Sequence, residues 1–321
     1  MTRRGLPTVT VLVPTLARSG RRELLLRALA SIRSQDGVAP TALVIVNGAD
    51  ADPDLLTRLA TEPDVVVLRI PQRGIPAAFR AGRPAVATSY FAALDDDDIL
   101  LPGALTARVA ALTVDDTRDA VVTDGFIRSA AGDRRMRENF LDVAVDPVRE
   151  MFRGNWLLPG SWLCRSDRVG AWLFEEMPDH RECTWIGLQL ATRARLAFLP
   201  TPTLVYHDDT PDGAHRHFAY CAAQPAAIRR FLTLPLPPDV RAQLRHSMAA
   251  AYHQVAHRLL IEEGRRGAAL RWHLRSLLAP GGRRHLLFTR KLLWPRRWLA
   301  RLVRRAAAVP PVEAPARSPS A

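Results

Sequence analysis

Short apolar runs alternate with helical stretches along the first 123 residues, and this alternation constrains the fold more than any other feature. Apolar and β-branched runs predict strands at residues 8–13, 42–46, 65–70, 90–94 and 120–123. Apolar residues spaced three and four apart predict helices between them, at residues 21–34, 54–60, 75–81 and 102–112. Such an order is typical of βαβ units, so we expect an α/β fold with a mostly parallel sheet flanked by helices.

The middle of the chain is less regular, and after Ala214 the pattern becomes helical. Residues 161–164 are a short apolar stretch, residues 182–193 a helix, and residues 194–206 a strand pair broken by Pro200 and Pro202. Further helices are expected at residues 215–232, 238–263, 267–278 and 283–305. We therefore expect three regions: an α/β domain over residues 1–210, a helical region over 211–308, and a disordered Pro/Ala/Ser-rich tail over 309–321.

Charge is distributed unevenly along the chain. The formal net charge is +13, and thirteen Lys or Arg residues with no Asp or Glu lie between Gly264 and Arg305. The three cysteines are too few and too scattered for a disulfide framework or a zinc site, which favours a reducing, cytoplasmic compartment. The apolar run at residues 9–13 is too short for a signal peptide, so none is expected, and no apolar run approaches the ~20 residues that span a bilayer.

Four consecutive aspartates follow the fourth predicted strand, in the run Phe91–Leu94 and then Asp95–Asp98. Adjacent carboxylates repel one another, so a cation or sugar hydroxyls between them would explain their retention at a strand end. Mg²⁺ and Mn²⁺ prefer carboxylate oxygens and substrate phosphates. The alternative is a solvated acidic turn that caps the helix predicted from Pro102.

The order of these segments resembles family 2 glycosyltransferases of the GT-A fold. The resemblance is carried by Val9–Thr15, which ends in Pro-Thr, by Leu25–Gln35, which reads Leu-x-x-x-Leu-x-Ser-Ile-x-x-Gln, by Val44–Asp50, by Gly74–Gly82, and by the Asp-x-Asp strand end Leu94–Asp98. It covers about the first 125 residues well and the next 80 weakly. The combination is specific, whereas no single segment is.

The resemblance implies a nucleotide-diphosphate sugar as donor and Mg²⁺ or Mn²⁺ on its leaving diphosphate. It implies that Asp97 and Asp98 hold the metal and that His207 completes the metal shell. The nucleotide-sugar would contact Pro14, Thr15, Asn47, Asp50, Arg80, Asp95 and Asp96. Many relatives carry Asp where this chain has Asn47. Arg80 also fits an ordinary surface position, and His207 an ordinary loop position.

Transfer with inversion also needs a general base that takes a proton from the acceptor hydroxyl. In the family this base is the Asp of a Glu-Asp pair at a helix start, but here the pair reads Glu182-Cys183. A thiol substitutes poorly for a carboxylate, so we assign the role to Glu182, with Asp179 as the second candidate. The alternative is that Glu182 only interacts with the helix dipole.

The acceptor face is implied at Trp156, Gly160, Ser161 and Trp162, because sugars stack on aromatic rings; core packing is the alternative for each tryptophan. A saccharide, a lipid-linked molecule or another hydroxyl compound would serve as acceptor.

The last predicted helix, residues 283–305, mixes Arg with Leu and Trp, and Pro295 is expected to kink it. Such a segment fits an anionic membrane surface, which would place the protein on the inner face of the membrane as a peripheral protein. The alternative is a basic helix packed on the catalytic domain. No nucleic-acid motif accompanies the cluster, so no nucleic-acid partner is expected.

The sequence as a whole predicts an inverting, metal-dependent glycosyltransferase. Two other functions fit part of it. A catalytically inactive relative that binds a nucleotide-sugar or a protein partner at the membrane would explain Cys183 and Asn47. A nucleotidyltransferase also pairs carboxylates with Mg²⁺, but its Gly-rich loop is only weakly matched by Ser19–Arg22.

Overall fold

The computed structural model describes residues 5–209 and 218–293. Its contacts divide the chain into two compact units, Met1–Leu244 and Arg245–Ala321. The division falls within helix α8 (Pro238–Ile261). The boundary predicted at residue 210 therefore lies inside the first unit, which also contains α7 (Phe218–Phe231).

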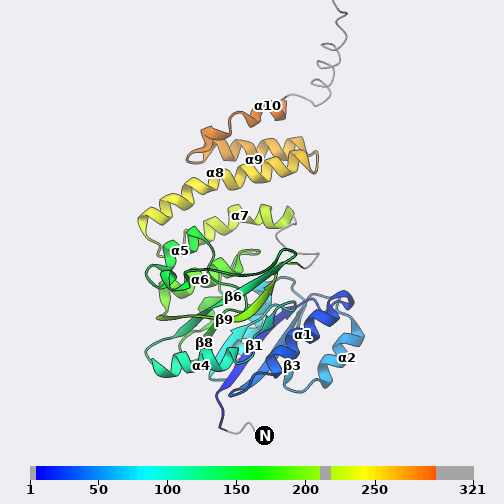
Figure 1. Ribbon diagram of the computed structural model, residues 1–321. Helices are drawn as coiled ribbons and strands as arrows, with labels where there is room; N and C mark the ends of the chain where they lie inside the picture. The colour runs from blue at the N-terminus through cyan, green and yellow to red at the C-terminus, as the bar shows by residue number, and fades with distance from the viewer. Residues whose placement is uncertain (1–4, 210–217, 294–321) are drawn as a thin grey trace, which may run out of the picture. The chain divides into compact units, whose positions relative to one another are not determined.

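The first unit is built on one sheet, in the order β3-β2-β1-β4-β8-β6-β9-β5, with β7 paired to β6 (Figure 1). The strands are β1 (Thr8–Thr15), β2 (Ala39–Asn47), β3 (Val65–Ile70), β4 (Tyr90–Ala93), β5 (Ile99–Leu100), β6 (Ala120–Ser129), β7 (Gly132–Arg135), β8 (Trp162–Arg165) and β9 (Leu196–His207). β3, β2, β1 and β4 run parallel. β8 is antiparallel to both β4 and β6, and β6 is parallel to β9. The predicted fold class, an α/β GT-A-like sheet with flanking helices followed by helices, is confirmed, with antiparallel strands in its second half.

The helices that follow these strands begin and end close to the predicted residues. In the first unit they are α1 (Arg22–Arg33), α2 (Pro53–Thr61), α3 (Ile75–Gly82), α4 (Ala104–Val114), α6 (Glu182–Arg193) and α7. A further helix, α5 (Pro147–Arg153), was not predicted. Short 3₁₀ segments are η1 (Ser19–Arg21), η2 (Arg83–Ala85), η3 (Phe140–Ala144) and η4 (Ala171–Leu173).

Alternation along the strands gives the sheet two buried faces. In β1, Val9, Val11 and Val13 face a core that also contains residues of α1, α2 and α4. On the other face, Leu12 and Ile45 pack so closely against α3 that a Cβ at Gly82 would lie 2.4 Å from Ile45 Cδ1. Burial on both faces explains why the first strands read as continuous apolar runs.

Two local predictions were wrong. The fourth helix begins at Ala104 rather than Pro102, because Pro102 and Gly103 form a turn in which Gly103 has φ 72°. Residues 196–207 form the single strand β9 rather than a broken pair, because its ladder with β6 steps from Leu199 to Pro202 and passes Pro200 in an irregularity. Proline is tolerated there since no ladder hydrogen bond is required of it.

The second unit contains the rest of α8, α9 (Arg266–Leu278), η6 (Gly282–His285) and α10 (Phe288–Leu293). The helix predicted over 283–305 is thus described only as η6 and α10, and residues 294–305 and the predicted tail 309–321 lie outside the described residues. No helix in the described part of the chain is long and apolar enough to cross a bilayer.

Candidate functional site

The candidate site lies where β1, β2 and β4 end. These strands are parallel, so Thr15, Asn47 and Asp95 emerge at the same edge of the sheet. In open α/β sheets this edge is where ligands bind. Two residues near the edge have left-handed backbone conformations, Ala17 with φ 47° and His180 with φ 62°. Strain of this kind gathers at functional sites, which supports the location.

Asn47 joins three segments at this edge. Its Nδ2 donates to the Thr15 carbonyl at 3.0 Å, and its Oδ1 accepts from the Gly74 amide at 3.0 Å. The side chain is 5% exposed. An aspartate could accept from Gly74 but could not donate to Thr15. The residue predicted to contact the nucleotide therefore positions the strand ends and the start of α3.

The aspartate turn is fixed by its second and fourth members. Asp96 accepts from Thr15 Oγ1 at 2.6 Å and from the Arg21 guanidinium. Asp98 is fully buried and accepts from the His207 amide at 2.8 Å, which joins the turn to the end of β9. Thr15, Asp96 and Asp98, all predicted ligand contacts, thus hold the turn in place through their side chains.

Helix α1 holds the segment after the same turn through hydrogen bonds, which gives the Ser-Ile-x-x-Gln motif a physical role. Ser31 Oγ accepts from the Leu100 amide at 3.1 Å. Gln35 donates to the Leu101 carbonyl and accepts from the Leu105 amide, each at 3.0 Å. These bonds tie α1 to the segment that directly follows the aspartates, so the motif positions the turn.

Asp95 and Asp97 are the two partly buried carboxylates of the turn. Burial raises the pKa of Asp95 well above its usual range, and the charges of Asp98, Asp97 and Asp96 raise it further. Asp97 pairs with Arg21 at 3.0 Å. Burial alone would lower the pKa of Arg21, but the hydrogen bonds and charges of Asp96 and Asp97 together outweigh burial and raise it. The Arg27 guanidinium also donates to the Asp97 carbonyl at 2.7 Å, so two arginines lie near four carboxylates and the turn is still short of positive charge.

This shortage of positive charge fits a divalent cation. Asp98 Oδ2 is buried and has no hydrogen-bond partner among the described residues. Within residues 5–209 and 218–293, however, no three His, Cys, Asp or Glu side chains gather as a metal site. His207 Nδ1 lies 3.9 Å from Asp98 Oδ1, and the predicted set of Asp97, Asp98 and His207 stays a prediction. Mg²⁺ is commonly held by one or two carboxylates together with substrate phosphates. This turn can supply the carboxylates.

Glu182, the first residue of α6, lies within charge range of Asp95. Its Oε1 accepts from the His180 amide at 2.9 Å. Burial raises the pKa of Glu182 to about 7, and the charge of Asp179 contributes to the rise. A carboxyl group with this pKa can accept a proton near neutral pH.

Cys183 lies where the sequence resemblance predicts the family's base. Burial raises the pKa of its thiol well above the usual value, and the charges of Asp95 and Glu182 raise it further. The thiol is therefore protonated at neutral pH and cannot act as a base. Tyr206 faces the same carboxylates; burial and the charge of Asp95 raise its pKa. Sequence reasoning missed Tyr206, which carried no motif.

An arginine that the sequence analysis did not single out, Arg73, lies at the same edge of the sheet, near the end of β2. Arg73 Nη2 donates to Asp50 at 2.8 Å, and a Cβ at Gly48 would lie 2.9 Å from Arg73 Cγ. Arg80, predicted to approach the diphosphate, is exposed in the last turn of α3, ~8 Å along the helix from the edge where the helix begins. Its position does not support that prediction, whereas Arg73 and Asp50 lie at the edge.

The predicted acceptor residues are part of the core. Trp156, Trp162 and Ser161 are fully buried. Trp156 packs edge-on against Phe198, and Trp162 edge-on against Phe91. A Cβ at Gly160 would lie 2.8 Å from Leu94 Cδ1. The rings cannot stack on a sugar, so the acceptor prediction was wrong for them and core packing explains all four residues. Pro14 is likewise buried in β1.

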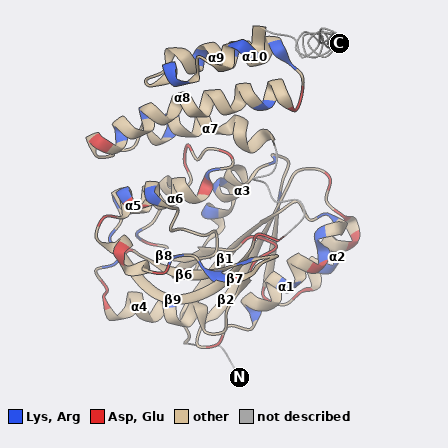
Figure 2. Cartoon of the chain, turned by 45° about the horizontal axis from the view of Figure 1, so that its top comes forward, with Lys and Arg blue, Asp and Glu red and all other residues tan. Residues whose placement is uncertain are grey.

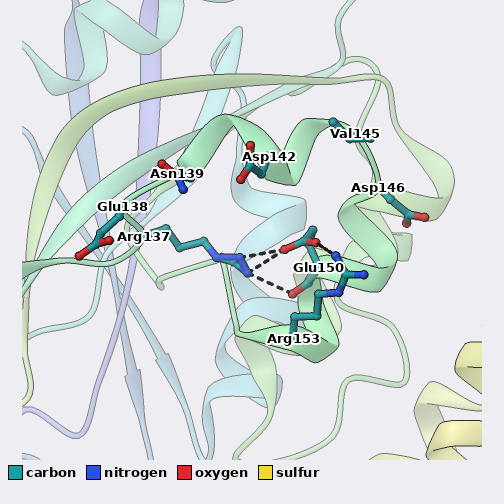
Figure 3. A pocket seen from close by; sticks show the side chains of 8 residues that line it. All are labelled: Arg137, Glu138, Asn139, Asp142, Val145, Asp146, Glu150 and Arg153. Carbon is teal, nitrogen blue, oxygen red and sulfur yellow. Dashed lines mark hydrogen bonds and ion pairs between the residues drawn. The ribbon is translucent and has the colours of Figure 1, made fainter.

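Two of the pockets on the first unit bear on the site predictions. One of about 610 Å³ adjoins the candidate base region and is lined by Met177, Pro178, Asp179, Ala223, Ala226, Arg229, Arg230 and Thr233. Asp179 Oδ1 also lies 3.4 Å from where a Cβ on Gly74 would be. Asp179 therefore lies both at this pocket and beside the start of α3. The other, of about 640 Å³, is closed on one side by bonds of 3.0 Å from Arg137 to Glu150 and contains none of the predicted site residues (Figure 3).

Comparisons with known proteins agree with this geometry. The sequence profile of Glycosyl transferase family 2 matches residues 10–166. A crystal structure of S. aureus TarS 1–349 in complex with UDP-GlcNAc is similar at a TM-score of 0.56 and 11% identity, over 84% of this chain and 82% of that one. A longer S. aureus TarS structure aligns at a TM-score of 0.55 and 11% identity, over 84% of this chain and 49% of that one. At this identity the likeness shows the fold. No curated protein sequence matches the chain.

Proposed function

This chain belongs to glycosyl transferase family 2, and on that premise we propose that it transfers a sugar from a nucleotide-diphosphate donor to a hydroxyl acceptor with inversion at the anomeric carbon. The observation that carries the proposal is the aspartate turn. Asp96 and Asp98 hold the turn in place, while Asp95 and Asp97 remain partly buried beside the ends of β1 and β2.

The donor would bind along the edge formed by β1, β2 and the start of α3. Asp50 and Arg73 lie there as an exposed ion pair that nucleotide groups can engage. TarS carries UDP-GlcNAc in one of its structures, so uridine diphosphate sugars are the first donors to test. Asp95 would accept hydrogen bonds from ribose or sugar hydroxyls.

Asp97, with Asp95 beside it, would hold Mg²⁺ or Mn²⁺ together with the donor diphosphate. When bound, the ion supplies positive charge to the departing diphosphate. Arg21 already faces Asp96 and Asp97 and adds a second positive charge at the same place. His207 would serve by fixing Asp98 through its amide rather than as a ligand.

Glu182 would act as the general base. The acceptor oxygen forms a bond to the anomeric carbon as the bond from that carbon to the diphosphate oxygen breaks. The acceptor proton passes to the Glu182 carboxylate, and the electron pair of the broken bond leaves with the diphosphate. Asp179 remains the second candidate for this base, since it is exposed between Gly74 and the adjoining pocket.

We also propose that the acceptor is a saccharide or lipid-linked molecule at the inner face of a membrane, where the basic segment 283–305 would hold the protein as a peripheral protein. The charge of that segment supports this proposal.

A second candidate function is an inactive relative that binds a nucleotide-sugar without turnover. The protonated thiol of Cys183 at the usual base position favours it. Single-turnover transfer from a radiolabelled donor to acceptor extracts separates the two, because the inactive relative would bind donor and form no product.

A thermal-shift screen of UDP-, GDP- and dTDP-sugars, with and without Mn²⁺, tests the proposed function. We expect one nucleotide class to raise the melting temperature, and Mn²⁺ to enlarge the shift. A flat response to every donor under both conditions would refute nucleotide-sugar binding and the transfer reaction with it.

A further inference from the structure

Helix α9 has an apolar stripe on its outer side. Leu270, Leu274 and Leu278 are 39%, 49% and 88% exposed. They are spaced four residues apart, so they follow one line along the helix. The buried residues of α9, which are Ala269, His273 and Ser276, lie on another side. Exposed leucines scattered singly are ordinary, but a row along one helix indicates a contact surface.

The direction of this stripe is fixed within the second unit. Ser276 Oγ donates to the Ala249 carbonyl of α8 at 2.9 Å. His273 Nε2 and Thr289 Oγ1 of α10 are hydrogen-bonded at 2.8 Å. Both bonds hold the inner side of α9 against its neighbours. The leucine row cannot turn inward without breaking them, so it is a lasting feature of the surface.

Arginines lie beside the leucine row. Arg271 and Arg275 follow Leu270 and Leu274 directly along the chain and are exposed. The guanidinium of Arg275 stacks over the Trp272 ring at 4.8 Å. Figure 2 shows blue bands and no red band on α9 and α10. From Gly264 to Leu293 the chain has no Asp or Glu, and its basic residues are Arg265, Arg266, Arg271, Arg275, Arg283, Arg284, Arg290 and Lys291.

We propose that α9 lies in the plane of an anionic lipid bilayer, with Leu270, Leu274 and Leu278 inserted among the acyl chains and Arg271 and Arg275 at the lipid phosphates. An apolar row beside a basic one is the pattern of interfacial helices. Long arginine side chains can keep their charge at the headgroups while their stems cover apolar surface. Leu286, Leu287 and Leu293, which are 54%, 74% and 70% exposed, add apolar surface in the same unit.

Charge decides between a bilayer and a second copy of this chain. A symmetric contact through α9 would bring two arginine rows together without an acidic residue in 264–293 to neutralise them. Anionic lipid supplies the opposite charge over an extended surface. The inference rests on the proposed membrane location and not on the transfer chemistry. It assigns the contact with lipid to α9 as well as to the basic segment 283–305.

Co-sedimentation of the full chain with vesicles of equal parts phosphatidylcholine and phosphatidylglycerol tests the proposal. Replacing the row, Leu270→Ser with Leu274→Ser and Leu278→Ser, should weaken partitioning by roughly 10- to 100-fold. The matched control replaces three exposed apolar residues of the first unit, Val114, Leu141 and Val145, by Ser and should partition as the wild type does. Equal partitioning of the row variant and the wild type would overturn the proposal.

A charge variant provides an independent test that leaves the leucines in place. Arg271→Gln with Arg275→Gln should weaken binding to the same vesicles by roughly tenfold or more and reduce its dependence on salt. Wild-type binding equal on vesicles of phosphatidylcholine alone would overturn the role of charge. Circular dichroism checks that each variant is folded.

Two further measurements distinguish lipid binding from self-association and from donor binding. If the wild type forms dimers in analytical ultracentrifugation without vesicles, and the row variant does not, the row is a self-association surface and the membrane proposal fails. The donor thermal shift is measured on the same proteins. A wild type that sediments with anionic vesicles but responds to no donor would refute the proposed function and leave the α9 surface standing.

Discussion

Like charges gather in two regions of this chain; they are largely buried in one region and exposed in the other. At the end of β4, Asp95–Asp98 are packed among backbone groups and Arg21, and burial raises the pKa of Asp95 and of Asp98. In the second unit, the arginines of α9 are exposed to water. Buried like charges destabilise one another and require a counter-ion nearby, whereas exposed like charges are solvated and act at longer range. The first arrangement suits a binding site and the second a surface contact.

The largest expected effect is on transfer. Glu182→Gln should lower the transfer rate by about 10²- to 10⁴-fold, because an amide cannot accept the acceptor proton. Donor affinity should stay unchanged. A radiolabelled transfer assay measures the rate, and the control is Glu175→Gln, an exposed glutamate in the same segment. Full activity in Glu182→Gln, with loss in Asp179→Asn, would move the base to Asp179.

The next effect concerns the counter-charge of the aspartate turn. Arg21→Gln leaves Asp96 and Asp97 without their guanidinium and should lower the free energy of unfolding by about 1–3 kcal/mol. Mn²⁺ should restore part of that loss, since it supplies the missing charge. Chemical denaturation measures both values. Arg22→Gln, which removes a single more exposed contact to Asp52, is the control and should cost less than about 1 kcal/mol. Equal losses would remove the special role of Arg21.

The raised pKa of Glu182 gives a pH dependence with a definite sign. The base must be ionised, so kcat/KM should fall about tenfold per pH unit below about pH 7. Stability should change in the other direction. Because the folded pKa is raised above its ordinary value of 4.5, the folded state binds more protons between that value and 7, and stability falls as pH rises through this window. Glu182→Gln should remove both dependences, which a pH series of rates and melting temperatures would detect.

The smallest expected effect is on the basic surface. Arg271→Gln with Arg275→Gln should change the free energy of unfolding by less than about 0.5 kcal/mol, because both guanidinium groups are exposed. Chemical denaturation in low salt measures it. A loss comparable to that of Arg21→Gln would mean that these arginines stabilise the fold, and the contrast between the two regions would disappear.

Most of the first 123 residues could be predicted because strand and helix periods are local properties of the sequence. β3 begins and ends at the predicted residues, and so does α6 further along the chain. The failures depend on distant neighbours. Pro200 sits inside β9 only because the ladder with β6 is irregular there, and nothing in the local pattern shows this.

The site was predicted in part. The aspartates were found because four consecutive carboxylates at a strand end are unusual, and Glu182 was found because the family resemblance implies an acidic residue at that helix start. Arg21 and Arg73 were missed because arginine is abundant along the whole chain, and only the fold brings Arg73 beside Asp50. Trp156 and Trp162 were misassigned, since a sequence does not distinguish a ring that packs in a core from one that faces a ligand.

The most direct test of the central claim is calorimetric titration of UDP into wild type and Asp97→Ala, each with and without Mn²⁺, with exposed Asp36→Ala as the control. We predict that Mn²⁺ tightens UDP binding to the wild type and to Asp36→Ala by about tenfold or more, and that Asp97→Ala loses this gain while remaining folded. UDP binding that is as tight in Asp97→Ala as in the wild type, or that does not respond to Mn²⁺ in the wild type, would contradict the claim that the aspartate turn holds the cation of the leaving diphosphate.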